Sequence, residues 1–159
     1  DELAGSAFLG LVGGQGAEVP KCDPASFAAK MEGLLAAIDQ GLVLACHDLA
    51  EGGLGVAIAE MAIGGEVGAK LDLAKLPGPD LPSEVRLFSE SNGRWLVEVA
   101  VAHAAAFEQA LAGTATARIG TTTEPRQLVI SDGELVVVDV AVSELAAAWT
   151  SFVPGYMGL

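Results

Sequence analysis

Residues 42–63 read LVLACHDLAEGGLGVAIAEMAI: an apolar run, a polar turn with two glycines, and a second apolar run. The first run, residues 42–46, has the continuous apolar character of a strand that is buried on both faces. The second run, residues 54–63, repeats its apolar side chains at helical spacing. The stretch therefore predicts a buried strand that passes through a polar turn, residues 47–53, into a helix.

The segments before this stretch are predicted from turn and capping signals. Residues 7–12 form a short apolar run that ends in Gly-Gly-Gln-Gly, a pattern that predicts a strand followed by a turn at residues 13–16. Asp23 and Pro24 are typical of a helix N-cap and a first helical position. The helix that they begin is expected to end before Gly41.

After this stretch, the pattern continues to alternate between strands and helices. Strands are expected at residues 67–73, 95–101, 115–121, 127–131 and 135–140, and helices at residues 103–111 and 142–151. Asp132 and Gly133 predict a hairpin turn between the last two strands. Residues 74–93 are expected to form a long irregular connection. The order predicts an α+β fold, a mixed sheet flanked by helices in about three layers (α/β/α), with residues 1–159 as one domain.

The composition limits the classes of partner. The chain has 8 basic and 21 acidic residues and a net charge of −13, which argues against nucleic acid and against an anionic membrane surface as partners. Its 52% hydrophobic and 18% charged residues argue against disorder. No apolar run reaches the roughly 18 residues that a membrane span needs.

The cysteines and the first residue indicate the setting of the chain. Cys22 and Cys46 do not make a disulfide framework, so we expect a reducing, cytoplasmic location with both thiols buried. The chain begins with Asp1 rather than Met. We expect it to be a piece of a longer protein or a processed chain.

The polar turn is the first candidate site, because a junction between a strand and a helix is a common ligand position. The backbone of Gly52 and Gly53 can approach a bound anion, and His47, Asp48 and Glu51 can act as acids, bases or metal ligands. The alternative is structural. Asp48 and Glu51 have the spacing of a capping box, and the two glycines allow a helix to pack closely.

The second candidate site is the loop that leads into the strand expected at residues 95–101. Its ligand-binding candidates are Ser89, Glu90, Ser91 and Arg94. The guanidinium of Arg94 can hold a phosphate or a carboxylate with two hydrogen bonds. The alternative is a solvated turn in which Arg94 pairs with Glu90.

The rest of the chain offers no catalytic residue and no metal ligand by motif. It contains no Ser-His-Asp order, no C-x-x-C and no metal-binding helix pair. Residues 13–16 lack the spacing of a dinucleotide-binding glycine motif. His103 is expected to be exposed or to cap a helix.

The two polar motifs also carry a family resemblance. Residues 46–61, CHDLAEGGLGVAIAEM, resemble the signature H-D-x-S-[DE]-G-G-L-A-V-A-L-A-E-M of the C-terminal domain of the synthetase subunit in the phosphoribosylformylglycinamidine synthase family. Residues 87–99 resemble its second signature, L-F-S-E-S-x-x-R-[FW]-x-V-x-V. Residues 3–9 are similar to L-G-G-S-E-[YF]-L, and residues 118–120 resemble a late I-G strand. Ala4, Ala7 and Ala50 depart from the family pattern.

The resemblance implies the last C-terminal-type domain of that enzyme, with a fold like the C-terminal domain of aminoimidazole ribonucleotide synthetase. The implied reaction uses ATP to activate the amide of formylglycinamide ribonucleotide. Glutamine-derived ammonia then displaces phosphate and gives the amidine. ATP and Mg²⁺ are implied to be held mainly outside this domain. The implied partners are the remaining synthetase domains, a glutaminase subunit or domain and the phosphoribosyl substrate.

The resemblance also implies a place for the second candidate site. Ser89, Glu90 and Ser91 are the counterpart of a substrate-contacting loop in the enzyme's other C-terminal-type domain, and belong to the catalytic site or to its pseudo-symmetric copy. The isolated domain is expected to be inactive and to self-associate through uncovered apolar surface. Two alternatives are a stand-alone ligand-binding or interaction module and the related domain of a hydrogenase maturation factor.

Overall fold

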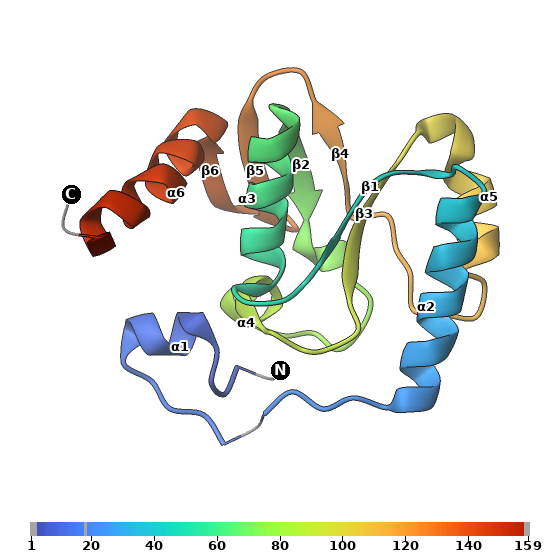
Figure 1. Cartoon of the computed structure of the whole chain (residues 1–159), viewed down its shortest axis with the longest axis horizontal. Coiled ribbons are helices and arrows are strands. Elements are labelled where there is room, and N and C mark those ends of the chain that lie inside the picture. Colours follow the sequence, from blue (N-terminus) through green and yellow to red (C-terminus); the bar gives the residue numbers. More distant parts are fainter. Residues whose placement is uncertain (1–2, 18, 158–159) are drawn as a thin grey trace. The chain divides into compact units, whose positions relative to one another are not determined.

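The computed structural model describes residues 3–17 and 19–157, and Figure 1 shows its elements. The chain forms two compact units. The first contains the residues up to 57 together with residues 77–117, and the second contains residues 58–76 and those from 118 onward. Each unit has a sheet of its own, with two strands in the first unit and four in the second.

The first unit is mainly helical. Its elements are α1 (Ala7–Val12), α2 (Pro24–Asp39), β1 (Val43–Asp48), α4 (Ser83–Phe88), β3 (Trp95–Val99), the 3₁₀ turn η2 (Val101–His103) and α5 (Ala104–Ala110). Helix α2 begins at its predicted cap, where the Asp23 side chain accepts a hydrogen bond from the Ser26 amide at 3.2 Å. Strands β1 and β3 pair in antiparallel fashion. The unit thus consists of a two-stranded ribbon with helices around it.

The core of the first unit lies between helices α2 and α5 and the β1–β3 ribbon. Its buried members are Leu34, Ala37, Leu42, Phe107 and Leu111. Partly buried side chains from both strands pack against this cluster. The ribbon is therefore fixed by apolar burial on the side that faces the two helices.

The second unit is built on a mixed sheet with the strand order β4-β2-β5-β6. Its elements are β2 (Gly68–Asp72), the 3₁₀ turn η1 (Leu73–Lys75), β4 (Gly120–Thr123), β5 (Gln127–Asp132), β6 (Leu135–Ala141) and α6 (Val142–Met157). Strand β2 pairs parallel to β5 and antiparallel to β4, while β5 and β6 form the predicted hairpin. Helix α3 (Gly53–Gly65) begins in the first unit and ends in the second.

The predicted α+β class, with a mixed sheet flanked by helices, is confirmed. The strand predicted at residues 7–12 is wrong, because this run forms helix α1. The Ser6 hydroxyl accepts a hydrogen bond from the Leu9 amide at 3.3 Å, and Gly13 ends the helix in the left-handed conformation. These two caps satisfy backbone groups at both ends of a run that is too short for its apolar pattern to distinguish a helix from a strand.

Several boundaries differ from the prediction. The irregular connection contains helix α4, the strand expected at residues 115–121 is found at Gly120–Thr123, and α6 runs to Met157. Strand β1 is not buried on both faces, because its side chains alternate between half-buried and exposed, and Leu44 is 63% exposed. Both cysteines are exposed rather than buried. Within the described residues, no helix is both long and apolar enough to cross a membrane.

Candidate functional site

The pairing of β1 with β3 brings the two candidate sites together. The last residues of β1, His47 and Asp48, lie opposite Leu96 and Trp95 at the start of β3. Just beyond the ladder, the Leu49 amide donates a hydrogen bond to the Arg94 carbonyl at 3.0 Å. The polar turn after β1 and the polar loop before β3 are therefore neighbours, although they are distant in the sequence.

The Glu90 carboxylate joins the two candidate sites directly. Its Oε1 atom accepts a hydrogen bond from the Gly52 amide at 2.8 Å and another from the Ala7 amide at 3.0 Å. Gly52 lies just before the first residue of α3, and Ala7 is the first residue of α1. The anion that the sequence predicts at the start of α3 is therefore supplied in this structure by the protein's own carboxylate.

Within the glycine pair, Gly53 allows two backbone segments to approach closely. Both Gly52 and Gly53 have left-handed backbone angles, with φ of 79° and 61°. A Cβ atom on Gly53 would lie 2.5 Å from the Ser89 carbonyl oxygen and 2.8 Å from that of Leu87. The structural alternative is thus supported for Gly53, whose missing Cβ lets the start of α3 pack closely on the end of α4 and the loop after it.

The Arg94 guanidinium organises its own loop. Its Nη2 atom donates to the Ser89 carbonyl at 2.6 Å, and its Nε atom donates to the Ser91 carbonyl at 3.0 Å. Ser89 is only 4% exposed. Whereas the sequence offered a pair between Arg94 and Glu90 as the alternative to ligand binding, the structure turns the two side chains to different backbone partners.

The exposed edge of the site is formed by His47, Asp48 and Glu51. The His47 and Asp48 side chains are 32% and 68% exposed, and Glu51 is exposed as well. The His47 Nδ1 atom lies 2.6 Å from the Asp48 carbonyl oxygen and 3.7 Å from its Oδ1 atom. The predicted capping box of Asp48 and Glu51 is wrong, because Asp48 belongs to β1 and α3 begins only at Gly53.

The thiol of Cys46, next to this edge, is electrostatically perturbed. Partial burial raises the pKa of Cys46, and the negative charge of Asp48 raises it further. Both causes disfavour the thiolate, so Cys46 is less reactive at neutral pH than an unperturbed cysteine. His103, the other histidine, is exposed and makes no capping hydrogen bond through its side chain.

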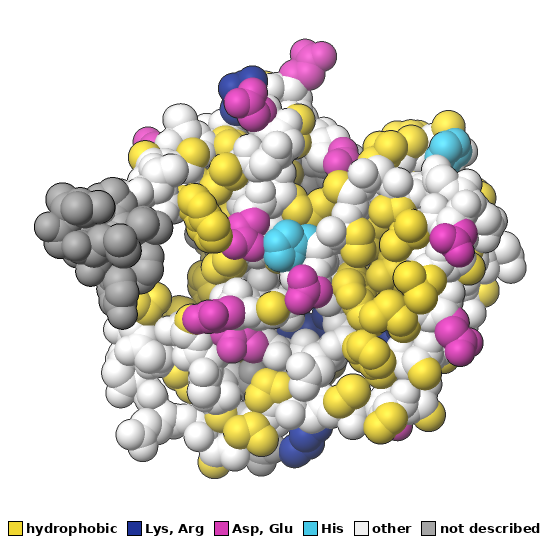
Figure 2. Space-filling model, viewed as in Figure 1, with side chains coloured by type: hydrophobic (Ala, Val, Ile, Leu, Met, Phe, Trp, Pro, Cys, Tyr) yellow, Lys and Arg dark blue, Asp and Glu magenta, His cyan; other side chains and the backbone are white. Residues whose placement is uncertain are grey.

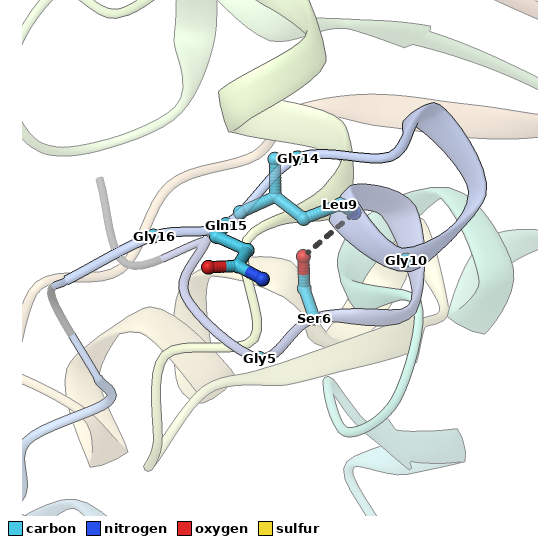
Figure 3. Close-up of a pocket in the computed structure, with 7 residues that line it drawn as sticks. All are labelled: Gly5, Ser6, Leu9, Gly10, Gly14, Gln15 and Gly16. Atoms are coloured by element: carbon cyan, nitrogen blue, oxygen red, sulfur yellow. Dashed lines mark hydrogen bonds between the residues drawn. The ribbon is translucent and has the colours of Figure 1, made fainter.

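A shallow hollow of about 320 Å³ lies beside α1 (Figure 3). It is lined by Gly5, Ser6, Leu9, Gly10, Gly14, Gln15 and Gly16. None of the nine candidate site residues lines it. Across the residues that the structure describes, no three His, Cys, Asp or Glu side chains gather in a way that could hold a metal ion.

Sequence reasoning missed the role of residues 3–9 in this site. Ala7 contributes a backbone amide, and Phe8 stacks on Phe88 with ring centroids 4.8 Å apart and planes inclined by 2°. A backbone donor carries no side-chain signal, so Ala7 could not be found from its residue type. The Ser6 hydroxyl, which is a usual N-cap group, was the available indication that a helix begins there.

The comparisons with known proteins agree on one family. The family described as AIR synthase related protein, C-terminal domain, matches residues 1–133. A phosphoribosylformylglycinamidine synthase subunit PurL from Deinococcus radiodurans is 35% identical over 164 residues, which covers 99% of this chain and 21% of that protein. The subunit from Limosilactobacillus reuteri is 40% identical over 126 residues, which covers 78% of this chain and 16% of that protein. The chain thus spans only 16% to 21% of the length of these relatives.

Solved structures of Thermotoga maritima PurL have the same fold. The complex with FGAR has a TM-score of 0.74 at 25% identity and covers 84% of this chain and 23% of that chain. The complex with ATP has a TM-score of 0.69 at 26% identity, and the match covers 76% of this chain and 22% of that chain. Because the family match takes in most of the chain, both signature motifs included, this protein belongs to the AIR synthase related proteins and matches their C-terminal domain.

Proposed function

We propose that this chain is the C-terminal-type domain of a phosphoribosylformylglycinamidine synthase synthetase subunit. The whole enzyme would use ATP and glutamine-derived ammonia to convert formylglycinamide ribonucleotide to formylglycinamidine ribonucleotide in purine biosynthesis. In this proposal, the domain supplies scaffold and one side of a ligand cleft. The named relatives support the proposal, and so does the solved complex of Thermotoga maritima PurL with FGAR, which has the same fold.

The observation that carries the proposal is the meeting of the two signature motifs. They are separated in sequence, yet β1–β3 pairing and the hydrogen bond from Gly52 to Glu90 hold them side by side. A packing role alone would favour apolar side chains at such a meeting point. Here Asp48 and Glu51 are exposed beside it and His47 is half-buried, which favours a polar ligand edge.

The nine candidate residues divide into two roles in this proposal. Five of them shape the cleft through backbone approach or backbone hydrogen bonds: Gly52, Gly53, Ser89, Glu90 and Arg94. The ligand contacts would come from the side chains at the accessible edge: His47, Asp48, Glu51 and Ser91. This division predicts different phenotypes for the two groups, because the first group acts through folding and the second through binding.

The charge of the chain supports a nucleotide site in other domains of the enzyme. Phosphoryl transfer needs cationic charge over the phosphates, but this chain has only 8 basic residues against 21 acidic ones. Acidic side chains are spread over the face shown in Figure 2. Among the described residues no three His, Cys, Asp or Glu side chains gather at one place, and we assign the Mg²⁺ of the proposed enzyme to its other domains.

The partners that we propose are the remaining synthetase domains and a glutaminase, in the cytoplasm. One solved neighbour is the PurLQS structure from Thermotoga maritima. Large hydrophobic side chains on the surface of the first unit support an intimate contact with other domains; they include Leu35, Leu44 and Val101, which are 51%, 63% and 79% exposed. Residues 1–159 would form one family domain, since the family match runs through parts of both units.

The test is reconstitution with the rest of the synthetase. The 159-residue chain is mixed with the remaining part of a PurL polypeptide, and phosphate release is measured with formylglycinamide ribonucleotide, ATP and ammonia. We expect activity only when both parts and all three substrates are present. The chain alone is expected to release no phosphate from ATP.

Matched variants separate the ligand edge from the rest of the surface. Asp48→Asn and Glu51→Gln should raise the KM for the ribonucleotide, whereas Glu84→Gln, an exposed carboxylate on α4, should leave it unchanged. An inactive mixture, in which both parts are folded and bound to each other, would contradict the proposed reaction. Binding without activity would favour the interaction-module alternative.

A further inference from the structure

The N-terminal strap, residues 3–16, contains a helix that buries none of its own side chains. This helix, α1, has only six residues. Leu11 is 87% exposed and Val12 is 62% exposed. Since a helix this short is unstable on its own, contacts outside α1 must fix it.

Two of those contacts reach the end of α4 and the residues just after it. The Ala7 amide donates to Glu90 Oε1 at 3.0 Å, and the Phe8 ring stacks on Phe88. The first contact is a hydrogen bond to a carboxylate and the second buries aromatic surface. Residues 88–90 therefore provide two of the contacts that hold the strap.

The same carboxylate oxygen also accepts the hydrogen bond from Gly52, at 2.8 Å. One side chain atom thus orients two backbone amides that belong to different segments, the strap and the turn before α3. When either amide leaves, Glu90 regains rotamer freedom, and the remaining hydrogen bond has to restrict that freedom alone. Such sharing couples the two segments energetically.

We propose that Glu90 is a latch. It couples docking of the N-terminal strap to the conformation of residues 49–53, the part of the polar turn that contains the two glycines. A change at either segment then shifts the other, because thermodynamic coupling is reciprocal. The latch gives a means by which a ligand or a neighbouring domain at the turn could loosen the strap. It holds whether or not the proposed enzymatic role is correct, because it rests on this chain's own hydrogen bonds.

Amide hydrogen exchange of the 159-residue chain tests the latch. In Glu90→Ala, we expect the amides of Ala7 and Gly52 to exchange about tenfold faster or more, as expected for loss of a charge-assisted hydrogen bond. The Ile130 amide, in strand β5, should be unchanged. The control variant Glu84→Ala removes an exposed carboxylate from α4 without touching the latch, and should leave all three amides unchanged.

A second variant separates coupling from independent attachment. Phe8→Ala removes the ring stack but leaves Glu90 and both amides in place. We expect Gly52 to exchange several-fold faster in Phe8→Ala, although Phe8 is not its hydrogen-bond partner. The proposal is overturned if Phe8→Ala accelerates Ala7 but leaves Gly52 unchanged, or if Glu90→Ala leaves both amides protected.

Discussion

Each unit of the molecule contains a carboxylate that accepts hydrogen bonds from two backbone amides, and the two differ in what they hold. In the second unit, Asp72 Oδ1 accepts from Ala74 and Gly133, each at 3.1 Å. Asp72 already lies opposite Ser131 in the sheet, so the ladder itself brings the hairpin near. In the first unit, the β1–β3 ladder brings the turn with Gly52 near Glu90, but no strand pairs with the segment of Ala7, which Glu90 also holds. The same chemistry therefore reinforces a sheet in one unit and, in the other, attaches a segment that lies outside the sheet.

The largest difference is expected between two glycines, one in each unit. Gly53 and Gly133 have nearly the same φ, 61° and 60°, but only Gly53 would place a Cβ against backbone, since nothing lies within 4 Å of one on Gly133. Gly53→Ala should lower the free energy of unfolding by about 3 kcal/mol or more, since overpacking adds to backbone strain. Gly133→Ala should cost about 1–2 kcal/mol from strain alone. Urea unfolding of both variants measures the difference, and equal losses would contradict the role of close approach.

The second expected effect concerns pH and the Asp72 carboxylate. The Gly133 amide, helped by the Ala74 amide and Lys75, lowers the pKa of Asp72 below its ordinary value of 3.8. The stabilisation is therefore fully present above about pH 4 and is lost as the pH falls through the lowered pKa. Asp72→Asn should be less stable at pH 7 and should lose less stability on acidification.

The control for this pH effect is Glu134→Gln, an exposed carboxylate in the same hairpin. Urea midpoints are measured between pH 7 and pH 2.5. We expect Glu134→Gln to follow the unsubstituted protein. If Asp72→Asn follows it too, the hydrogen bonds to Asp72 add no net stability to the second unit.

A smaller effect is expected at Cys46, in the first unit, where a carboxylate acts through its charge alone. Asp48→Asn removes one of the two causes that raise the pKa of Cys46 and leaves the larger one, burial. Alkylation of Cys46 by iodoacetamide at pH 8 should become about two- to threefold faster in low salt, and less so in high salt. Cys22, which is also exposed, serves as the reference thiol in the same sample. An unchanged rate ratio would show that burial alone sets the reactivity of Cys46.

The smallest effect is expected at an exposed ion pair in the second unit. Arg126 Nη2 lies 2.8 Å from Glu66 Oε2, and the two side chains are 61% and 70% exposed. Glu66→Gln should change the free energy of unfolding by no more than about 0.5 kcal/mol, because water and salt screen such a pair. A loss of unfolding free energy comparable with that of Gly133→Ala would show that this ion pair anchors the start of β5. Exposed charge pairs would then stabilise the second unit more than expected from their exposure.

The parts of the fold that the sequence predicts well are those with strong local signals. Asp23 and Pro24 mark the start of α2, and Asp132 with Gly133 marks the hairpin, because capping and turn chemistry act within a few residues. The strand predicted at residues 7–12 is wrong for the opposite reason, since a run of six mostly apolar residues fits both the helical and the strand period. The exposure of Leu44 was not predictable, because continuous apolar sequence resembles a strand covered on both faces.

The candidate site is predictable in its residues but not in their partners. Both polar motifs were recognised from local sequence, yet the neighbour of Glu90 is a backbone amide at Gly52 rather than the guanidinium at Arg94. That choice depends on the β1–β3 register and on the approach of α3 to the end of α4, which are set by tertiary packing. Sequence spacing alone favours the nearest opposite charge, and here the structure provides a different partner.

The parallel pairing of β2 with β5 has a consequence for the order in which the chain folds. Strand β2 ends at Asp72, while β4 and β5, its two sheet partners, end only at Thr123 and Asp132. At a synthesis rate of 5–20 residues per second, β2 waits about 3–12 s on the ribosome for β5. During that interval Leu71 of β2 and Leu73, the first residue of η1, which are both almost fully buried in the native protein, lack their β5 neighbour. We therefore expect the second unit to complete its sheet later than the first unit completes its β1–β3 ribbon, and to be the part that chaperones would meet exposed.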